Sequence, residues 1–595
     1  MRLGVDTGGT FTDIVGWDGA RVLTRKVRST PDDPSRAILE GIAGLAAEEI
    51  VHGSTVATNA LLERKGARTA FVTTKGFEDL LRIGRQNRKH LYDLLGQGRA
   101  ELAPARWTFG VEERTLYDGT ILQAVDPGAA RSLAEELRRH RIESVAVCLL
   151  HSYANAQNEL ALQAELEGFS VSLSHEILPE YREFERASTT LVNAYVMPLM
   201  ARYLKRLADK LAPTRLRVMQ SNGGSISAEM AGRSAIHTIQ SGPAGGLLGA
   251  AAVARRAGFG RIISFDMGGT STDVSLYDGA PGFTQESEIG DFPVRVPILN
   301  IHSVGAGGGS IARIDAGGAL RVGPQSAGAS PGPVCYGYGE QITITDANLF
   351  LGRIDPEKFL SGRMRLDPGR AARYLERFAR SAGAGAVSVA RAIIDVANSN
   401  MERAIRAVSI ERGYDPRDFA LVSFGGAGGL HACDLAVRLE ISTVLVPRHA
   451  GVLSALGMLA ADCVRDYSRS VLGKPARPAF QEMERQAAAE FAGMGFPAPL
   501  CEQLIDLRYR GQSYEITMPW AARASFDAEH RRLYGYDHQG REVEGVTARL
   551  RATGVTEKID LAAPAPPETF SSTYVPAGWR GEEDEAGNLI LRKAS

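Results

Sequence analysis

The octapeptide DTGGTFTD at residues 6–13 decides the fold, because it returns at residues 266–273 as DMGGTSTD, with six of its eight positions unchanged. Each copy follows a short apolar run and precedes another, which predicts a strand, a glycine turn and a second strand. A single Asp-x-Gly-Gly-Thr is usually an ordinary hairpin turn. Two copies that share their flanking residues favour a functional interpretation.

The glycine turns predict two binding sites for phosphate. Their backbone N–H groups point outward with no Cβ atom in the way, which makes a nest for phosphate oxygens. A carboxylate beside such a nest would repel phosphate unless a divalent cation lay between them, so Asp6 and Asp266 imply Mg²⁺. We therefore expect a clamp, built from the two halves of the chain, that closes on a nucleoside polyphosphate.

A third glycine-rich element lies further along the chain. A strand is expected at residues 419–424, and it runs into GGAGG at residues 425–429 and a helix that begins near Leu430. This order of strand, glycine turn and helix N-terminus suits close approach of an adenosine or a phosphate. Such turns also serve packing, so this element gains its weight from the two hairpins that precede it.

Composition excludes several classes of function. The chain has 595 residues, enough for three or four domains, and its 68 Lys and Arg balance 69 Asp and Glu. This balance predicts neither a nucleic-acid partner nor a polybasic membrane patch. No apolar run reaches membrane-spanning length, no signal peptide is expected, and the five cysteines are scattered without a Cys-x-x-Cys pair. We expect a cytoplasmic α/β enzyme without a cysteine zinc site.

Alternating strand-like and helix-like stretches organise the rest of the chain. Long helices are expected at residues 185–211, with a kink at Pro198, and at residues 387–412, ended by Gly413. Residues 300–339 are rich in glycine and show little periodicity, which predicts a functional loop or, alternatively, a surface excursion. Further expectations are a helix at residues 475–499, strands at residues 504–518, and a proline-rich linker at residues 563–567 before a short polar tail.

Three tempting motifs fail on physical grounds. Ser330 lies in a Gly-x-Ser-x-Gly pattern, but the following Pro331 has no N–H to donate to an oxyanion. Gly473-Lys474 is followed by proline, so there is no Walker A loop. His431 and Cys433 are two residues apart on an expected helix and face different directions, which favours buried side chains over a metal site.

Together these segments resemble the hydantoinase A / 5-oxoprolinase family. The resemblance implies an α/β fold of duplicated actin-like (ribonuclease H-like) ATPase domains, with inserted subdomains and a small C-terminal α+β region. The implied domains are residues 1–180 with the first hairpin, residues 181–470 with the second hairpin and the adenosine loop, and a shortened C-terminal domain of residues 471–595, in which a β-rich module usual in the family is missing or reduced. The segments that carry the resemblance are residues 6–13, 52–60, 74–77, 241–246, 266–273, 305–310, 326–336, 345–348 and 424–431, and more loosely 508–512.

The resemblance also implies an activity and its partners. It implies ATP-dependent opening of a small cyclic amide, of the 5-oxoproline or hydantoin type, by an ATP-binding subunit that phosphorylates the substrate. Such a subunit works with a hydantoinase B-type subunit in a hetero-oligomer. The alternative is the ATP-binding subunit of an acetone- or acetophenone-type carboxylase, which activates a ketone. A non-enzymatic actin-like ATPase clamp and a small-molecule kinase are less favoured.

Residue roles follow from the motifs. Asp6 and Asp266 are the expected Mg²⁺ ligands and, with Asp273, the expected catalytic residues, although Asp273 has a structural alternative. The substrate candidates have the alternative of capping and packing a strand-to-helix joint; they are His52, Thr55, Thr58, Asn59, Gly307 and Gly308. The expected contacts to ATP are Thr7, Gly8, Gly9, Thr10, Asp13, Gly268, Gly269, Thr270, Gly425, Gly426, Gly428 and Gly429.

Overall fold

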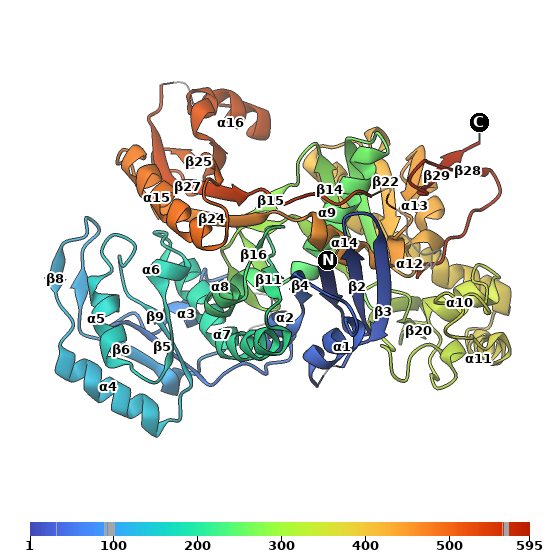
Figure 1. The fold of residues 1–595 in the computed structure, drawn as a ribbon, viewed down its shortest axis with the longest axis horizontal. Helices are drawn as coiled ribbons and strands as arrows, with labels where there is room; N and C mark the ends of the chain where they lie inside the picture. The colour runs from blue at the N-terminus through green and yellow to red at the C-terminus, as the bar shows by residue number, and fades with distance from the viewer. Residues whose placement is uncertain are drawn as a thin grey trace.

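Two β-sheets with the same local topology form the centre of the molecule (Figure 1). The computed structural model describes residues 1–30, 32–87, 92, 101–538, 540–561, 563 and 570–594. In each sheet three antiparallel strands are followed by two more strands, each parallel to the strand before it. The first set is β3 (Val22–Arg28), β2 (Phe11–Trp17), β1 (Arg2–Thr7), β4 (Glu49–Ser54) and β11 (Arg215–Met219). The second set is β19 (Ile301–Val304), β14 (Thr272–Asp278), β13 (Arg261–Met267), β22 (Ala420–Phe424) and β23 (Thr443–Val446).

This repetition confirms the duplicated α/β fold expected from the two octapeptides. Both octapeptides form the predicted strand, turn and strand, with β1 paired to β2 and β13 paired to β14. The apolar runs that flank the turns are buried on these strands, for example Leu3, Val5, Phe265 and Val274. Burial of these runs fixes the register, because a slip by one residue would turn every apolar side chain to the other face.

Two glycine-bearing helices cross between the sheets. Helix α9 (Ser241–Arg256) packs on β13 and β4, and α14 (Leu453–Ala460) packs on β1 and β2. A Cβ atom added at Gly249 would lie 2.6 Å from the carbonyl oxygen of Leu453, and one at Gly457 would collide with the backbone of Gly245. The helices therefore meet backbone to backbone, at a spacing that only glycine permits.

An inserted subdomain lies in the chain between β4 and β11 of the first sheet. Its sheet has the order β10-β9-β5-β6, and the long helix α7 (Glu183–Leu211) packs against it. Helix α7 confirms the expected helix at residues 185–211 and runs through Pro198 without a break. The sheet consists of β5 (Thr69–Thr74), β6 (Thr108–Val111), β9 (Ser144–Cys148) and β10 (Ser170–Leu173), with α4 (Pro127–Arg139) and α5 (Gln157–Glu165) beside it (Figure 1).

The segment at residues 300–339 is more regular than its sequence indicates. It contains β19 and a two-stranded hairpin of β20 (Ser310–Ile314) and β21 (Leu320–Ser326), in which Ala312 and Val322 are buried. The prediction of little periodic structure was wrong here, because each strand is short and its apolar positions are interrupted by glycine and proline. Helices α10 (Ile344–Phe350), α11 (Pro368–Ser381) and α12 (Ala386–Val408) follow, and Gly413 has the positive φ expected after a helix end.

The C-terminal part of the chain joins both central sheets. Strands β24 (Cys463–Ser470), β25 (Leu500–Tyr509), β26 (Ile516–Pro519) and β27 (Val543–Gly554) extend the first sheet to ten strands through β12 (Ser225–Ser227). Helices α15 (Arg477–Gly493) and α16 (Phe526–Tyr534) accompany them. The expected linker at residues 563–567 lies outside the described residues except for Ala563. The chain then crosses to the second sheet, where β29 (Leu589–Lys593) pairs with β23 and with β28 (Trp579–Glu583) (Figure 1).

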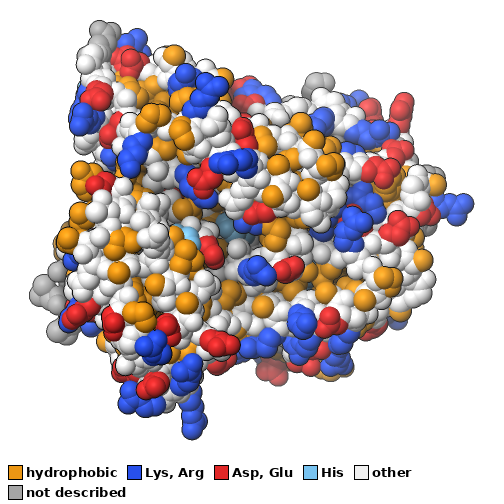
Figure 2. All heavy atoms as spheres, turned by 60° about the vertical axis from the view of Figure 1, so that its left-hand side comes forward, with side chains coloured by type: hydrophobic (Ala, Val, Ile, Leu, Met, Phe, Trp, Pro, Cys, Tyr) orange, Lys and Arg blue, Asp and Glu red, His pale blue; other side chains and the backbone are white. Residues whose placement is uncertain are grey.

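Shorter elements complete the description. No helix among the described residues is both long enough and apolar enough to cross a membrane. Positive and negative side chains are interspersed over the face drawn in Figure 2, without a large field of one sign. The shorter helices and strands are α1 (Pro34–Gly41), α2 (Val56–Leu62), α3 (Leu80–Ile83), β7 (Arg114–Thr115), β8 (Ile121–Gln123), α6 (Ser174–Ile177), α8 (Ala228–Arg233), β15 (Phe283–Thr284), β16 (Ser287–Ile289), β17 (Phe292–Val294), β18 (Ile298–Leu299) and α13 (Ala432–Arg438).

Candidate functional site

The two hairpins place four aspartates at matching positions. Asp6 lies opposite Asp13 in the β1–β2 ladder, and Asp266 lies opposite Asp273 in the β13–β14 ladder. Side chains of directly opposed residues are close neighbours on an antiparallel pair, and like charges there destabilise it. Both hairpins have this pair of opposed aspartates despite its electrostatic cost, which favours a functional role for them.

The aspartates of the two hairpins lie close enough to affect one another electrostatically. Burial is the largest cause of the raised pKa of Asp6, which lies at about 7, and the charges of Asp13 and Asp273 raise it further. Burial also raises the pKa of Asp266 well above the ordinary value, with further contributions from Asp273, Asp6 and Asp13. Since carboxylates from one half of the chain act on those of the other half, both hairpins contribute to one site.

This donor set fits a divalent cation. Burial raises the pKa of Asp13 and Asp273 as well, and of the four carboxyl groups only that of Asp13 has a direct ion pair with a residue that the structure describes, Lys26. Among the described residues, no group of three or more His, Cys, Asp or Glu side chains forms a metal cage. Mg²⁺ suits such a place, because it commonly uses one or two carboxylates and completes its octahedron with waters and phosphate oxygens. Asp6 and Asp266 are the residues that would hold it.

The second glycine of each turn opens on empty space. A Cβ atom added at Gly9 or at Gly269 would meet no protein atom within 4 Å. The N–H groups of Gly8 and Gly268 instead close their turns, each 3.0 Å from a carbonyl oxygen, that of Phe11 and of Ser271 respectively. The expectation that all four glycine N–H groups face phosphate therefore narrows to Gly9 and Gly269, with the threonines that follow them.

The glycine-rich loop at residues 305–310 braces the second hairpin. Gly308 donates its N–H to the carbonyl oxygen of Gly268 at 3.0 Å, and Gly309 donates to that of Gly269 at 2.7 Å. A Cβ atom at Gly307 would lie 2.6 Å from the backbone nitrogen of Thr270. These contacts account for Gly307 and Gly308 as scaffold residues, and they lend no support to the expected substrate role.

The other substrate candidates separate into buried and accessible groups. His52 is fully buried, with one ring nitrogen 3.2 Å from the carbonyl oxygen of Val5 and the other 2.8 Å from the hydroxyl of Tyr203. Burial lowers the pKa of His52 to about 4, so its ring is neutral and satisfied, as the packing alternative requires. Thr55 occupies the N-cap position of α2 without a side-chain capping hydrogen bond, and Asn59 is exposed.

Thr58 is the candidate most closely connected to the hairpins. Its hydroxyl accepts the N–H of Gln240 at 3.1 Å. Gln240 has a φ of 61°, in the left-handed region that a non-glycine residue seldom adopts, and it precedes α9. A Cβ atom at Gly242, in the first turn of α9, would lie 3.4 Å from the carboxylate of Asp6. A strained segment thus joins Thr58 to the expected metal ligand.

The expected adenosine loop is largely occupied by protein contacts. Gly425 has a φ of +80° and fits closely against Asp266 and Met267. Cβ atoms at Gly428 and Gly429 would lie 2.9 Å from the hydroxyl of Ser423 and 2.5 Å from that of Thr573. Of the four glycines only Gly426 has open space, since a Cβ atom added there would lie 3.9 Å from the nearest protein atom. Of the glycines expected to contact adenosine, only Gly426 therefore has room for an approaching group.

A segment of the C-terminal tail, residues 570–574, lies along this loop. Ser572 donates its N–H to the carbonyl oxygen of Gly426 at 3.2 Å, and Tyr574 donates to that of Gly429 at 3.1 Å. Phe570 is buried against Gly451, where an added Cβ atom would lie 2.5 Å from that of Phe570. The sequence carries no local signal for this contact, because more than 140 residues separate the two segments.

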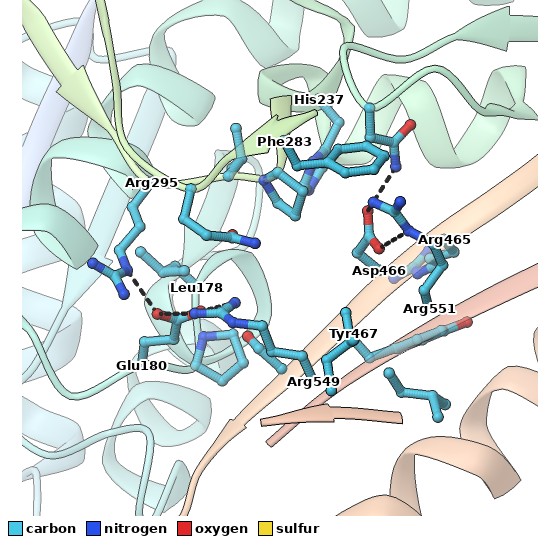
Figure 3. Close-up of a pocket in the computed structure, with 18 of the residues that line it drawn as sticks. Leu178, Glu180, His237, Phe283, Arg295, Arg465, Asp466, Tyr467, Arg549 and Arg551 are labelled. Carbon is cyan, nitrogen blue, oxygen red and sulfur yellow. Dashed lines mark hydrogen bonds and ion pairs between the residues drawn. The ribbon is translucent and has the colours of Figure 1, made fainter. Parts of the chain in front are cut away.

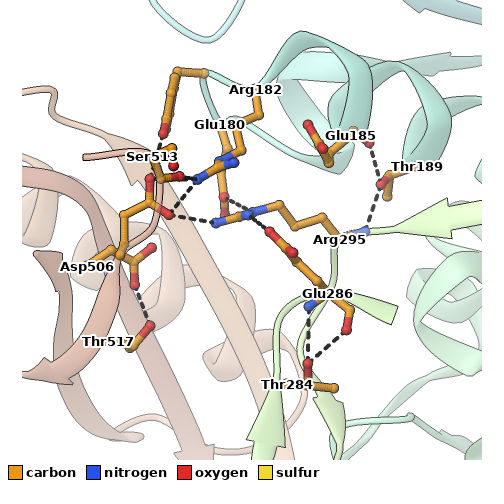
Figure 4. Close-up of polar contacts among 12 residues, drawn as sticks. Glu180, Arg182, Glu185, Thr189, Thr284, Glu286, Arg295, Asp506, Ser513 and Thr517 are labelled. Carbon is orange, nitrogen blue, oxygen red and sulfur yellow. Dashed lines mark hydrogen bonds and ion pairs between the residues drawn. The ribbon is translucent and has the colours of Figure 1, made fainter. Parts of the chain in front are cut away.

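A separate cavity of about 390 Å³ lies away from the hairpins (Figure 3). His237 and Phe283 lie on one side of it, and charged side chains line its walls in pairs, Asp466 with Arg551 and Glu180 with Arg549. Glu180 also pairs with Arg295, and Arg182 pairs with Glu515 in the same ionic network (Figure 4). None of the four hairpin aspartates lines this cavity.

The histidine rejected as a metal ligand is part of the core. His431 is buried, with one ring nitrogen 2.7 Å from the amide oxygen of Asn398 and the other 3.2 Å from the amide nitrogen of Asn348. Burial lowers its pKa to about 4. The sequence-based rejection of a His431–Cys433 metal site agrees with this geometry.

Family models match most of the chain. The model described as hydantoinase/oxoprolinase matches residues 186–467, and that described as the hydantoinase/oxoprolinase N-terminal region matches residues 2–168. Caprolactamase subunit alpha from Pseudomonas jessenii is 35% identical, over 97% of this chain and 90% of that protein. The 5-oxoprolinase 1 of Arabidopsis thaliana is 33% identical over 97% of this chain, which spans only 52% of that longer protein.

Solved structures show the same architecture over the full length. The crystal structure of ATP-dependent caprolactamase from Pseudomonas jessenii matches with a TM-score of 0.88 and 30% identity, covering 100% of both chains. The nucleotide-free structure of acetone carboxylase matches with a TM-score of 0.79 at 24% identity, over 100% of this chain and 99% of that one. The second likeness concerns the fold alone.

Proposed function

Because this chain belongs to the hydantoinase/oxoprolinase family, we propose that it uses ATP to phosphorylate a small cyclic amide of the 5-oxoproline or hydantoin type, so that the ring opens by hydrolysis. The observation that supports the proposal is the pair of matched hairpins, one from each half of the chain, each with two opposed aspartates and a second turn glycine that has open space around it. A clamp of this kind suits a polyphosphate.

The chemistry addresses the stability of an amide. An unstrained lactam resists hydrolysis, since its carbonyl carbon is a poor electrophile and its nitrogen a poor leaving group. Transfer of the γ-phosphoryl group from ATP to the amide oxygen gives ADP and an imidate-like phosphate. Water then adds to the carbon of that intermediate, and the C–N bond breaks, so that the nitrogen leaves as an amine and the carbon becomes an acyl phosphate. A second water hydrolyses the acyl phosphate, which gives the amino acid and inorganic phosphate.

The residues of the cleft supply positioning and charge compensation. Phosphoryl transfer depends mainly on these two effects. The N–H groups of Gly9 and Gly269 would hold phosphate oxygens, with Thr10 and Thr270 beside them. Bound Mg²⁺ would neutralise phosphate charge, held by Asp6 and Asp266. Asp273, hydrogen-bonded to Ser303, would brace its hairpin or polarise a nucleophile.

We propose a hydantoinase B-type chain as the partner. The relative from Pseudomonas is named as a subunit alpha, which supports a multi-chain enzyme. The chain spans about half the length of the 5-oxoprolinases that it matches. The partner would receive the activated amide and complete its hydrolysis.

The test is a turnover assay with a panel of substrates. The purified chain, with ATP and Mg²⁺, is given 5-oxoproline, hydantoin or caprolactam, with and without a hydantoinase B-type protein, and ADP and ring-opened product are measured. We expect one cyclic amide to stimulate ADP release, with ring-opened product formed when the partner is present. ADP release that no cyclic amide stimulates would identify an ATPase clamp, and a stable phosphorylated product that the partner leaves unopened would identify a kinase.

A further inference from the structure

Lys26 on β3 lies among the aspartates of both hairpins. Its ammonium nitrogen is 2.6 Å from the carboxylate of Asp13, its cross-strand partner, and 3.0 Å from the carbonyl oxygen of Gly451. Burial raises the pKa of Asp13, Asp6 and Asp266, and the charge of Lys26 offsets part of that rise for all three. This one cation therefore acts on carboxylates from both halves of the chain.

The ammonium group keeps one hydrogen-bond donor in reserve. A lysine has three N–H donors, and Asp13 and Gly451 take two of them. The described residues supply no third hydrogen-bond acceptor to Lys26, whose remaining neighbours are the rings of Phe11 and Phe570, at 5.4 and 5.9 Å. The side chain is only 12% exposed, so water replaces that partner poorly. The unused donor therefore suits a ligand oxygen in the cleft.

We propose that Lys26 binds the polyphosphate of the nucleotide by donating to an oxygen of its β- or γ-phosphate, and that Phe570 of the C-terminal tail positions it. The proposal rests on the nucleotide site proposed above. A lysine ammonium is a compact point charge, and phosphoryl transfer needs charge compensation at a fixed place. Phosphate contact with Lys26 would add a cation to a cleft that is otherwise dominated by carboxylates.

Phe570 is placed to hold Lys26 in that position. Its Cβ atom and backbone pack against Gly451, whose carbonyl oxygen accepts from Lys26, and the guanidinium of Arg363 lies 5.2 Å from the centre of its ring. The two backbone hydrogen bonds of Ser572 and Tyr574 fix the segment that carries Phe570. The lysine side chain is therefore enclosed by the tail on one side and bound to Asp13 on the other.

Calorimetry of the full-length chain tests the role of Lys26. The ligands are ADP and a non-hydrolysable ATP analogue, each with Mg²⁺, and AMP as the nucleotide without a β-phosphate. Because a hydrogen bond to a charged group is at stake, we expect Lys26→Met to weaken ADP and the analogue by about 10- to 100-fold. The affinity for AMP should stay unchanged. Lys26→Arg should restore part of the loss, and the exposed Lys65→Met is the matched control.

A double variant separates ligand binding from local charge balance. If Lys26 served only to neutralise Asp13, then Lys26→Met combined with Asp13→Asn would bind ADP as the Asp13→Asn single variant does, and this result would overturn the proposal. The double variant also removes the unpaired carboxylate, so it remains informative if Lys26→Met alone folds poorly. Continued loss of ADP affinity in the double variant would support the phosphate contact.

A double-mutant cycle tests Phe570. We expect Phe570→Ala to weaken ADP binding when Lys26 is present and to add nothing to Lys26→Met, because Phe570 acts through the lysine. Additive effects would overturn the positioning role. Failure of the wild-type chain to bind any adenine nucleotide would instead remove the proposed function, whereas unchanged binding by Lys26→Met in a chain that binds nucleotide would overturn the role of Lys26 alone.

Discussion

Asp266 stands directly opposite Asp273 across the β13–β14 hairpin. The first hairpin repeats this relationship with Asp6 and Asp13, so the cleft concentrates four acidic groups in an environment that penalises their charge. The arrangement costs stability in the absence of a ligand and gains it back when a cation enters. This exchange underlies the first predictions.

Replacing Asp266 by asparagine should separate catalysis from stability. Asp266→Asn removes an expected metal ligand, so ATP hydrolysis should fall by at least about 100-fold. The thermal midpoint of the nucleotide-free protein should hold or rise, since a buried like-charge contact disappears. The control is Asp278→Asn, at the exposed end of the paired strand β14. Wild-type turnover in Asp266→Asn would contradict the metal role.

Filling the second turn should block the nucleotide without harming the fold. Gly269 has open space around its missing Cβ atom and no positive φ, so valine fits the protein but not a bound phosphate. Gly269→Val should weaken ATP binding by at least about tenfold, measured by calorimetry. Gly260→Val is the matched control, because Gly260 is equally open but lies before β13. Normal affinity in Gly269→Val would refute the phosphate nest.

Nucleotide should stabilise the chain only when magnesium is present. With ATP at about 100 times its dissociation constant, mass action adds about 2.7 kcal/mol to the free energy of unfolding. The same ATP in a chelator should add much less, because four carboxylates then oppose the triphosphate. Differential scanning calorimetry measures the difference. Equal stabilisation with and without Mg²⁺ would show that no cation bridges the aspartates and the phosphates.

Glu180 should contribute strongly to the free energy of unfolding. It pairs with Arg295 and Arg549, all three being buried, and thereby ties the start of α7 to β27 and to the segment after β17. Glu180→Gln leaves two buried guanidinium groups undercompensated and should cost about 3–5 kcal/mol in urea unfolding. Glu229→Gln, in an exposed pair with Arg233, should change nothing measurable.

Protonation of the Glu180 carboxylate should lower the stability of the protein in acid. Burial opposes its ionisation, but Arg549 and Arg295 outweigh that effect and lower the pKa of Glu180 from 4.5 to about 2. Its contribution is therefore complete above pH 4.5 and is lost as the pH falls through about 2. The shift corresponds to about 3 kcal/mol. The stability difference between wild type and Glu180→Gln should shrink across this window, and a constant difference would exclude it.

The sequence predicted the elements whose signals are local. The octapeptides, the long helices and the glycine after α12 each carry their pattern within a few residues, and the structure has them in place. The turn at residues 425–429 was found as well. The reason for most of its glycines was not, because they make room for Asp266, Ser423 and Thr573, which lie elsewhere in the chain.

Residues defined by tertiary contacts escaped prediction. Lys26 lies on an ordinary-looking strand, and only the folded β2–β3 ladder places its ammonium group beside Asp13. His52 was expected to contact the substrate, but its buried hydrogen bonds to Val5 and Tyr203 do not support that role. The tail at residues 570–574 has no periodic pattern, and its position follows from β29, which brings the chain back to the second sheet.

The crossing of α9 and α14 has a mechanical consequence. Because Gly249 and Gly457 meet there without side chains, the two helix backbones are in direct contact and neither position has room for a larger residue. Helix α14 packs on the first copy of the repeated sheet and α9 packs on strands of both copies, so this contact lies where the two halves of the chain meet. A methyl group at Gly457 would force the two helices apart. It should thereby change the spacing of the two hairpins, although it would not touch the phosphate itself.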